Sequence, residues 1–264
     1  MRRRTLGFIG LAAVSAATPA LMAGAGAGQA STPMTVHTGA KVTVSVPTVV
    51  TGNTVQADVT VRGLHLRCDL AGTGDRAGTG HYHTILDGSL VDMECAHRVG
   101  ISLQNVTPGK HTLTVVPTDN SHAEDPSAAK SVTFTYRPAH PLPALTARTT
   151  AAKPGITIVS PKPGTTVKGA FTLRVRVTNF TLSGNLFGKA DVDGYGHWHA
   201  NLDTTTGPMM GMGTMLGMSG TRTFRVSLAG VKPGAHRFYA VLVDNKHAPT
   251  PGAMASVRVS VAAR

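Results

Sequence analysis

An internal duplication constrains this chain more than any other feature of its sequence. A shift of 116 residues places Gly80-His81-Tyr82-His83 on Gly196-His197-Trp198-His199. Nine residues are inserted after this block, and a shift of 125 residues then aligns 108–111 with 233–236 and 119–122 with 244–247. Similar blocks at a fixed spacing are the signature of a repeated structural unit. The sequence therefore predicts two copies of one domain.

The two copies have clear limits along the chain. Residues 31–137 form repeat 1 and residues 154–264 form repeat 2, each of ordinary size for a domain. Residues 138–153 lie between them and are rich in Pro, Ala and Thr. This composition is typical of a short, semi-rigid linker.

Alternating apolar and polar residues indicate strands in both repeats. In repeat 1 the alternation covers 41–46, 56–61, 112–116 and 131–136, and Gly- and Pro-containing turns separate the runs. Helical periodicity is absent, and only 14% of the residues are charged, which disfavours long helices. We expect an all-β protein made of two tandem immunoglobulin-like β-sandwiches, with six or seven strands in each.

The first 30 residues have the pattern of an export signal. Arg2, Arg3 and Arg4 precede an apolar run over 6–17, and small residues at 28–30 precede Ser31. Such a segment predicts a signal peptide that is removed on export, by either the Sec or the twin-arginine route. We expect the mature protein to be secreted or held in the cell envelope.

The charge of the chain bears on its partners. The formal net charge is +12, and removal of the three N-terminal arginines leaves +9. The remaining basic residues are scattered, without the aromatic-interleaved cluster that nucleic-acid binding requires. Attraction to anionic cell-wall polymers is the interaction that this charge favours. No later apolar run reaches the length of about 18 residues that a membrane span needs, so none is predicted.

The chain has two cysteines, Cys68 and Cys95. In an exported protein such a pair predicts a single disulfide. The alternative is a pair of thiolates that binds Zn²⁺ together with histidines.

Two histidine pairs stand on predicted strands. Side chains alternate across a strand, so His81 and His83 share one face while Tyr82 occupies the other. In repeat 2, Trp198 lies between His197 and His199. Because Trp198 is large and apolar, we assign its face of the strand to the core. We therefore expect the histidine pairs to face outward, their Cα atoms about 7 Å apart, close enough to bind one metal ion.

A third histidine joins each predicted pair. His122 and His247 follow a strand that pairs antiparallel with the histidine strand, so they should approach the pairs at the same end of the sandwich. His111 and His236 begin that strand about 23 Å away, and we interpret them as structural. Three converging imidazoles suit Zn²⁺ or Cu²⁺. The alternative is that the Asp-x-x-His segments are turns whose aspartates bind backbone amides.

A methionine-rich segment occupies the insertion in repeat 2. Residues 207–220 contain five of the ten methionines: Met209, Met210, Met212, Met215 and Met218. Thioethers on a glycine-rich loop suit Cu(I), and the topology brings Met215 and Met218 nearest the histidines. An adaptable apolar surface for a protein partner is the competing interpretation. The same topology makes His97 an optional fourth ligand in repeat 1.

Each repeat resembles a family of uncharacterised secreted bacterial domains with a Gly-x-Gly-His-x-His…Asp…Pro-Gly-x-His…Asp-x-x-His pattern. The residues that match are 78–83, Asp87, 108–111 and 119–122, with their counterparts in repeat 2. The chain is also broadly similar to small β-sandwich copper-handling proteins of the bacterial envelope. That second resemblance rests on fold and composition, which by themselves do not imply function.

Three functional hypotheses follow. The first is an exported protein that binds copper, or zinc, for storage, transfer or resistance, with another envelope protein as a partner. The second is a tandem adhesion or wall-binding module whose histidines are incidental. The third is a superoxide dismutase-like copper enzyme, which is disfavoured because no bridging histidine or second compact His and Asp cluster is evident. No nucleophile elbow or catalytic carboxylate pair is present, so we expect no enzymatic activity.

Overall fold

The structure of the chain is a computed structural model that describes residues 35–148, 151–206 and 212–263. The predicted signal peptide over 1–30, and Met209 and Met210, lie outside the described residues. Ser31–Arg264 form one compact unit.

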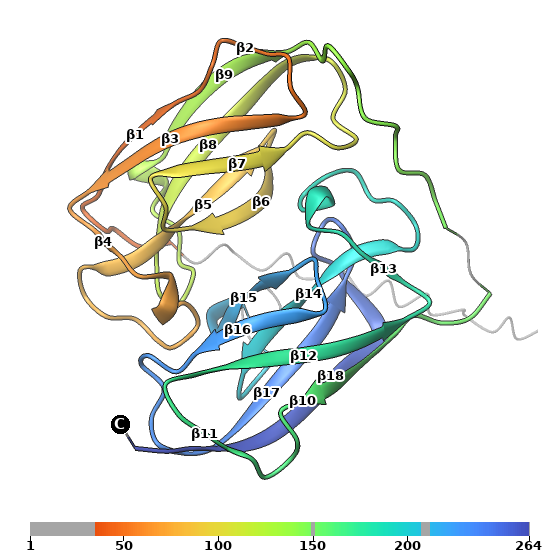
Figure 1. The fold of residues 1–264 in the computed structure, drawn as a ribbon. Helices are drawn as coiled ribbons and strands as arrows, with labels where there is room; N and C mark the ends of the chain where they lie inside the picture. Colours follow the sequence, from red (N-terminus) through yellow and green to blue (C-terminus); the bar gives the residue numbers. More distant parts are fainter. Residues whose placement is uncertain (1–34, 149–150, 207–211, 264) are drawn as a thin grey trace, which may run out of the picture. The chain divides into compact units, whose positions relative to one another are not determined.

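Repeat 1 consists of two sheets packed face to face (Figure 1). The smaller sheet is antiparallel, whereas in the larger sheet the short strands β2 and β4 pair parallel with their neighbours. The smaller sheet has the order β1-β3-β7, and the larger has the order β2-β9-β8-β5-β4, with β6 also paired to β5. The strands are β1 Lys41–Ser45, β2 Val49–Val50, β3 Thr54–Arg62, β4 His65–Leu66, β5 Thr79–Leu86, β6 Ser89–Glu94, β7 Arg98–Ser102, β8 Gly109–Asp119 and β9 Lys130–Tyr136. Two 3-10 turns, η1 Cys68–Leu70 and η2 Pro126–Ala128, complete it.

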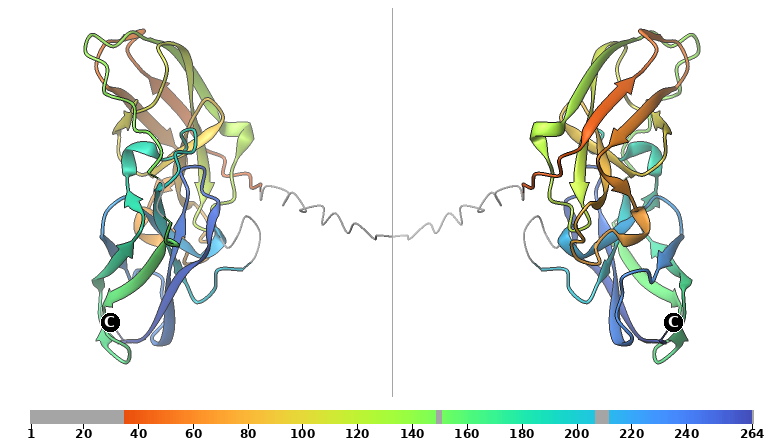
Figure 2. Two further views of the ribbon diagram at one scale, coloured as in Figure 1. Left: turned by 90° about the vertical axis from the view of Figure 1, so that its right-hand side faces the viewer. Right: turned by 90° about the vertical axis from the view of Figure 1, so that its left-hand side faces the viewer.

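Repeat 2 has the same arrangement, which Figure 2 shows from two further sides. Its smaller sheet has the order β10-β12-β16, and its larger sheet has the order β11-β18-β17-β14-β13, with β15 paired to β14. The strands are β10 Gly155–Ser160, β11 Thr166–Val167, β12 Ala170–Thr178, β13 Thr181–Leu182, β14 Tyr195–Leu202, β15 Met215–Ser219, β16 Thr223–Ser227, β17 Gly234–Val243 and β18 Pro249–Val261. The 3-10 turns are η3 Gly184–Leu186 and η4 Met212–Thr214. The predicted tandem β-sandwich is confirmed.

Each sandwich has its own apolar core. In repeat 1, alternate residues of β3 point inward against Tyr82, Leu113 and Phe134. In repeat 2, Trp198 is fully buried against Phe238, and its indole Nε1 donates to the carbonyl of Thr221 at 2.7 Å. The large aromatic residue of the histidine strand therefore faces the core, as the alternation predicted.

One element differs from the expectation. Residues 207–220 are expected to form a loop, whereas 215–219 fold back as β15 and pair antiparallel with the histidine strand β14. In repeat 1, β6 pairs with β5 in the same way. Met215 and Met218 consequently belong to a strand, in which alternate residues are buried. Backbone pairing satisfies the amides of this segment, and glycine, which is tolerated in short edge strands, does not prevent it.

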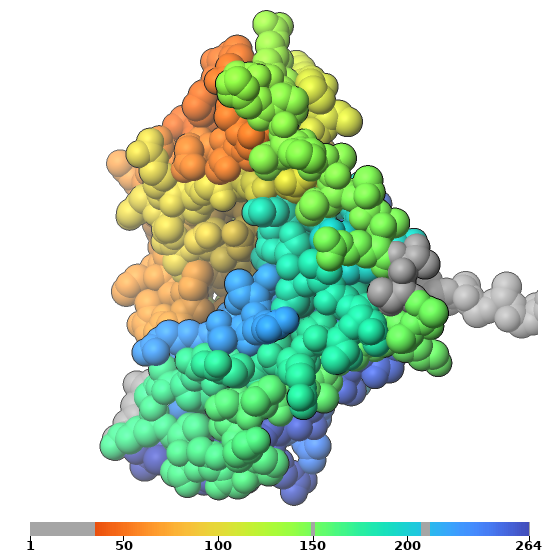
Figure 3. Space-filling model, turned by 45° about the vertical axis from the view of Figure 1, so that its right-hand side comes forward, coloured from red at the N-terminus to blue at the C-terminus, as the bar shows by residue number. Residues whose placement is uncertain are grey.

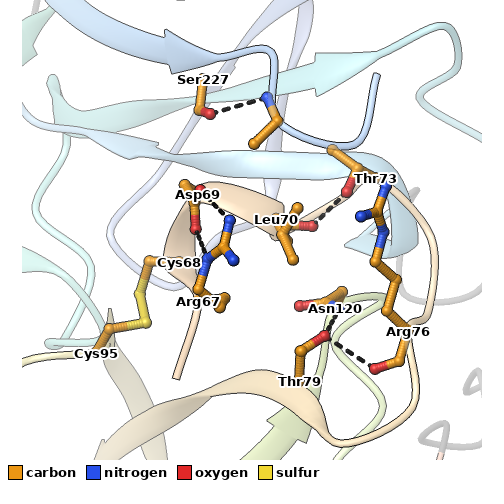
Figure 4. Close-up of polar contacts among 11 residues, drawn as sticks. Arg67, Cys68, Asp69, Leu70, Thr73, Arg76, Thr79, Cys95, Asn120 and Ser227 are labelled. Atoms are coloured by element: carbon orange, nitrogen blue, oxygen red, sulfur yellow. Dashed lines mark hydrogen bonds and ion pairs between the residues drawn. A yellow bond between two sulfur atoms is a disulfide. The ribbon is translucent and has the colours of Figure 1, made fainter. Parts of the chain in front are cut away.

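A disulfide joins Cys68 in η1 to Cys95 after β6, with the Cα atoms 5.8 Å apart (Figure 4). This confirms the predicted pairing and leaves no thiolate for a metal, since neither cysteine is free. A disulfide fits a protein that folds in an oxidising compartment outside the cytoplasm. Among the described residues, no helix has the length and apolar character needed to cross a membrane.

The linker is bound to both repeats. The Asn105 side chain donates to the carbonyl of Leu145 and accepts from its amide, both at 2.9 Å. The amide of Arg148 donates to the carbonyl of Asp193 at 2.8 Å, and its guanidinium lies 5.5 Å from the centre of the Tyr195 ring. The described part of the linker runs over the outside of the protein (Figure 3).

Candidate metal centres

The first group of histidines, which we call the first triad, comprises His81, His83 and His122. His122 Nδ1 lies 3.0 Å from His81 Nε2 and 3.4 Å from His83 Nε2. The three nitrogens lie within 4.8 Å of one another. β5 supplies the first two rings, and the turn after β8 supplies the third. The structure thus brings together the three residues that the sequence predicted to converge.

The turn that presents His122 depends on Asp119. One oxygen of this carboxylate accepts from the amide and hydroxyl of Ser121 at 2.8 Å and from the amide of Ala123 at 2.9 Å. His122 itself has a φ of 64°, a left-handed conformation that the bonded turn holds. Turn chemistry and convergence of the histidines are therefore both present. Asp119 holds the backbone of the turn through these hydrogen bonds, and the turn orients the ring of His122 toward the other two histidines.

The outer nitrogens of the first triad have polar partners. His83 Nδ1 donates to Glu124 Oε1 at 2.8 Å, and His122 Nε2 donates to the carbonyl oxygen of Met215 at 2.7 Å. A hydrogen bond at one ring nitrogen fixes the tautomer, so the inner nitrogens of these two rings present lone pairs. His81 Nδ1 is buried and has no partner among the described residues.

The second triad comprises His197, His199 and His247 and repeats this geometry. His197 Nε2 lies 3.1 Å from His199 Nε2 and 3.0 Å from His247 Nδ1, and the remaining pair is 3.3 Å apart. His247 Nε2 donates to the carbonyl oxygen of Leu90 at 2.9 Å. His197 Nδ1, the counterpart of His81 Nδ1, is likewise buried without a partner among the described residues.

Both triads face away from the core of their own sandwich, yet they are not exposed. His81 and His83 are 0% and 1% exposed, because each triad lies where the two repeats contact each other. The expectation of solvent-facing pairs is therefore wrong. Alternation along a strand identifies the face of the sheet, but it does not show what covers that face.

Burial favours the neutral form of five rings in the two triads, those of His81, His122, His197, His199 and His247. Burial lowers the pKa of His122 and of His199 to about 3, and the positive charge of neighbouring histidines lowers both further. Burial likewise lowers the pKa of His81 and His197 well below the ordinary value. Neutral imidazole is the form that coordinates a metal. Three imidazole nitrogens that converge in a buried site fit the His₃ part of a tetrahedral Zn²⁺ or copper site.

The two triads differ in one partner. Glu124 contacts His83 in repeat 1, and the equivalent position in repeat 2 is Pro249, which has no polar side chain. Sequence reasoning missed Glu124. The alignment of the repeats contained the signal, because Glu124 follows the Asp-x-x-His segment by two residues and is not matched in repeat 2.

His97 is not brought to the first triad. Its ring is exposed and Nδ1 lies 3.3 Å from the carbonyl oxygen of Val59, at the turn between β6 and β7. The prediction of a fourth ligand is therefore wrong. β6 remains paired with β5 up to Glu94, and the chain then turns toward the smaller sheet and takes His97 with it.

His111 and His236 have both ring nitrogens engaged. His111 Nδ1 donates to Asp87 Oδ2 at 2.7 Å, and its Nε2 lies 2.8 Å from the carbonyl oxygen of Thr107. His236 makes the same two contacts, with Asp203 and with the carbonyl of Lys232, each at 2.8 Å. These partners leave no nitrogen for a metal, in keeping with a structural role.

The described methionines of residues 207–220 are divided between two cavities. Met215 is buried and, with Met212, lines a cavity of about 360 Å³ that also borders His199 and His247. Met218 pairs in register with His199, yet it lines a different cavity beside His81. Met93, which pairs with His83, occupies the equivalent position in repeat 1 and lines that second cavity too. Sequence reasoning missed Met93.

Comparison with known proteins identifies no family. No family model matches the chain, and no curated protein matches it. Among solved structures, it is similar to fibronectin(III)-like modules of CbhA from Clostridium thermocellum, at 11% identity and a TM-score of 0.28, over 83% of this chain and 94% of that chain. It is also similar to a tetra-tandem repeat of a large adhesion protein, at 13% identity and a TM-score of 0.27, over 84% of this chain and 49% of that chain. The β-sandwich assignment rests on the sheets described above.

Proposed function

We propose that this chain is an exported, non-enzymatic metal-binding protein that holds one copper or zinc ion in each histidine triad. Storage, transfer or resistance is the role that such a protein would serve in the cell envelope. The proposal includes removal of the N-terminal segment before Ser31, which N-terminal sequencing of the secreted protein tests.

The convergence of three imidazole nitrogens within 4.8 Å, twice in one chain, is the observation that supports this proposal. The inner nitrogens of the triads lie 3.0–3.4 Å apart, so each contact can hold at most one proton. In His83, His122 and His247 the ring proton is on the outer nitrogen, where it is donated to a hydrogen-bond partner. Buried lone pairs that face one another are unfavourable unless a cation or a proton lies between them. A metal ion satisfies all three at once.

The donor set also favours a transition metal over Ca²⁺ or Mg²⁺, because the latter prefer oxygen ligands. When bound, the ion would use His81, His83 and His122 in repeat 1 and His197, His199 and His247 in repeat 2. The protein contributes imidazole donors, and outer hydrogen bonds fix the tautomers of His83, His122 and His247. Glu124 and the two backbone carbonyls orient the rings from behind, as partners of metal-bound histidines generally do.

Elemental analysis of the untagged, exported protein tests the proposal. We expect about two equivalents of copper or zinc in the wild-type chain, and about one after His83→Gln or after His199→Gln. His111→Gln is the matched control, since that histidine lies outside both triads, and should retain two equivalents. Absence of metal from the wild type, together with failure to bind added Zn²⁺ or Cu²⁺, would leave the tandem adhesion module as the better hypothesis.

A further inference from the structure

We propose that the two triads have different roles: the first holds a resident ion in a closed site, and the second exchanges copper as Cu(I) through the adjoining cavity. This inference rests on the proposed function and specifies which of the two sites communicates with solvent and in which oxidation state copper enters.

The cavity beside the second triad connects the surface with the histidines. Of its lining residues, Met254 is 51% exposed, whereas Met215 is 1% exposed. His199 and His247, both half-buried, line the same cavity. Thioethers are therefore present at the outer and inner parts of the cavity, with Met212 as a third. Such a sequence of soft donors is suited to passing a soft cation inward.

The first triad also borders a cavity, at His81, but its three rings are only 0–2% exposed, and residues 35–38 lie against Glu124 and Asp125 on its other side. Glu124 pairs with Thr35 and with Thr118, and its carbonyl accepts from the amide of Val36 at 2.9 Å. Two residues later in the chain, the amide and hydroxyl of Thr38 donate to Asp125 at 2.7 and 2.8 Å. Residues 35–38 thus lie over the side of the first triad on which Glu124 contacts His83.

In repeat 2 the equivalents of Glu124 and Asp125 are Pro249 and Thr250, and both line the cavity. Neither side chain can anchor a covering segment with a carboxylate. His83 has a carboxylate partner and is 1% exposed, whereas its counterpart His199 is half-buried. The two triads therefore have the same arrangement of inner nitrogens but differ in how accessible their rings are to solvent.

The charge balance favours a monovalent ion in the second triad. In the second triad all three ligands are imidazoles, and among the described residues no carboxylate is hydrogen-bonded to them to offset the charge of a buried ion. The triads also lie close together, since His122 donates to the carbonyl of Met215, and Met215 lines the cavity that borders His199. A divalent ion in the first triad consequently disfavours a second divalent ion more than it disfavours Cu(I). Imidazole and thioether are both ligands that Cu(I) accepts.

Titration of the full mature chain with Cu(I), against a chromogenic Cu(I) chelator under reducing conditions, tests the inference. The variant Met212→Leu, Met215→Leu, Met254→Leu removes three sulfurs while nearly preserving volume. We expect it to weaken the tighter Cu(I) site by about tenfold or more and to change Zn²⁺ affinity by less than about twofold. Met93→Leu, at the other cavity, should change neither affinity. If the triple variant unfolds, Met254→Leu alone, at the half-exposed position, should still weaken Cu(I) binding.

Exchange kinetics provide the second measurement. After loading with two equivalents of Zn²⁺, a chelator should remove one equivalent at least about tenfold faster than the other, and Thr250→Phe in the cavity wall should slow only the fast phase. Equal release rates, or an unchanged Cu(I) affinity in the methionine variants, would overturn the inference while leaving two metal sites in place. A wild-type chain that binds neither Zn²⁺ nor Cu(I) would instead overturn the proposed function.

Discussion

His122 Nε2 lies 2.7 Å from the carbonyl oxygen of Met215, so a ring of repeat 1 donates a hydrogen bond to the backbone of repeat 2. The equivalent ring of repeat 2, His247, donates to the carbonyl of Leu90 in repeat 1. Leu90 and Met215 are themselves equivalent by the shift of 125 residues. The two repeats therefore contact each other through a symmetrical pair of bonds, as two copies of a self-complementary surface do. Each bond uses the outer nitrogen of a predicted metal ligand.

This arrangement predicts that metal binding and docking of the repeats are coupled. We expect a chain with a protease site inserted into the linker to remain one particle after cleavage when loaded with Zn²⁺. Removal of the metal frees the rings of His122 and His247 to reorient, and the cleaved halves should then separate. Size-exclusion chromatography with and without chelator measures this. Halves that stay together equally well in both conditions would contradict the coupling.

The close contact of Gly72 with repeat 2 predicts a sensitive position. Gly72 has a φ of +71°, and a Cβ atom built there would lie 2.6 Å from the carbonyl oxygen of Met215. The hydrogen bonds of the segment around η1, shown in Figure 4, hold this loop in place; among them Thr73 donates to the carbonyl of Leu70 at 2.7 Å. Gly72→Ala should therefore destabilise the protein by about 2–4 kcal/mol, through backbone strain and the collision.

Gly74→Ala is the matched control for this prediction. Gly74 has a φ of +92°, but nothing lies within 4 Å of a Cβ atom at that position, so only the backbone strain remains. Urea unfolding of both variants gives the two changes in free energy. An equal loss in the two variants would show that the contact with Met215 does not contribute.

The histidine pKa values predict a metal-free protein that is sensitive to mild acid. Burial lowers the pKa of His81, His122, His197, His199 and His247 in the folded state, whereas in the unfolded chain each returns to about 6.5. The unfolded state thus binds more protons below pH 6.5, so folding stability is fully present above that pH and falls as the pH drops toward about 3. Each group contributes up to about 1.4 kcal/mol per pH unit to this slope.

Urea unfolding of the metal-free protein at pH 7.5, 6.0 and 5.0 measures the dependence. The double substitution His81→Asn and His197→Asn removes two of the five groups and should flatten the profile. A free energy of unfolding that stays constant from pH 7.5 to pH 5.0 in the wild type would contradict the prediction.

Glu124 is expected to tune the first triad without binding the ion. Glu124→Gln keeps the size of the side chain but weakens the hydrogen bond that orients the His83 ring. Loss of such a partner typically lowers metal affinity by about 10–100-fold. Competition titration with Zn²⁺ should show this loss for one of two sites. Glu94→Gln, a carboxylate outside both triads, should leave both sites unchanged, and an equal effect of the two substitutions would rule out the orienting role.

Several features were already determined by local sequence patterns. Alternation placed the β3, β5, β8 and β9 strands and assigned Trp198 to the core, because a strand exposes successive side chains to opposite faces. The duplicated Asp-x-x-His segments placed His122 and His247 beside the histidine pairs. The pairing of Cys68 with Cys95 followed from there being only two cysteines in a chain with an export signal.

The remaining features depend on contacts between residues far apart in the sequence. The triads become buried when the repeats pack together, and the same packing forms the bonds from His122 to Met215 and from His247 to Leu90. Residues 35–38 cover one side of the first triad through contacts with a part of the chain far away in sequence. The pairing of β6 and β15, and the position of Met254 at the second triad, have the same origin. Sequence periodicity reports which face of a strand a residue occupies, since that depends on the local backbone. Only the tertiary structure decides what lies against that face, because the covering atoms come from another part of the chain.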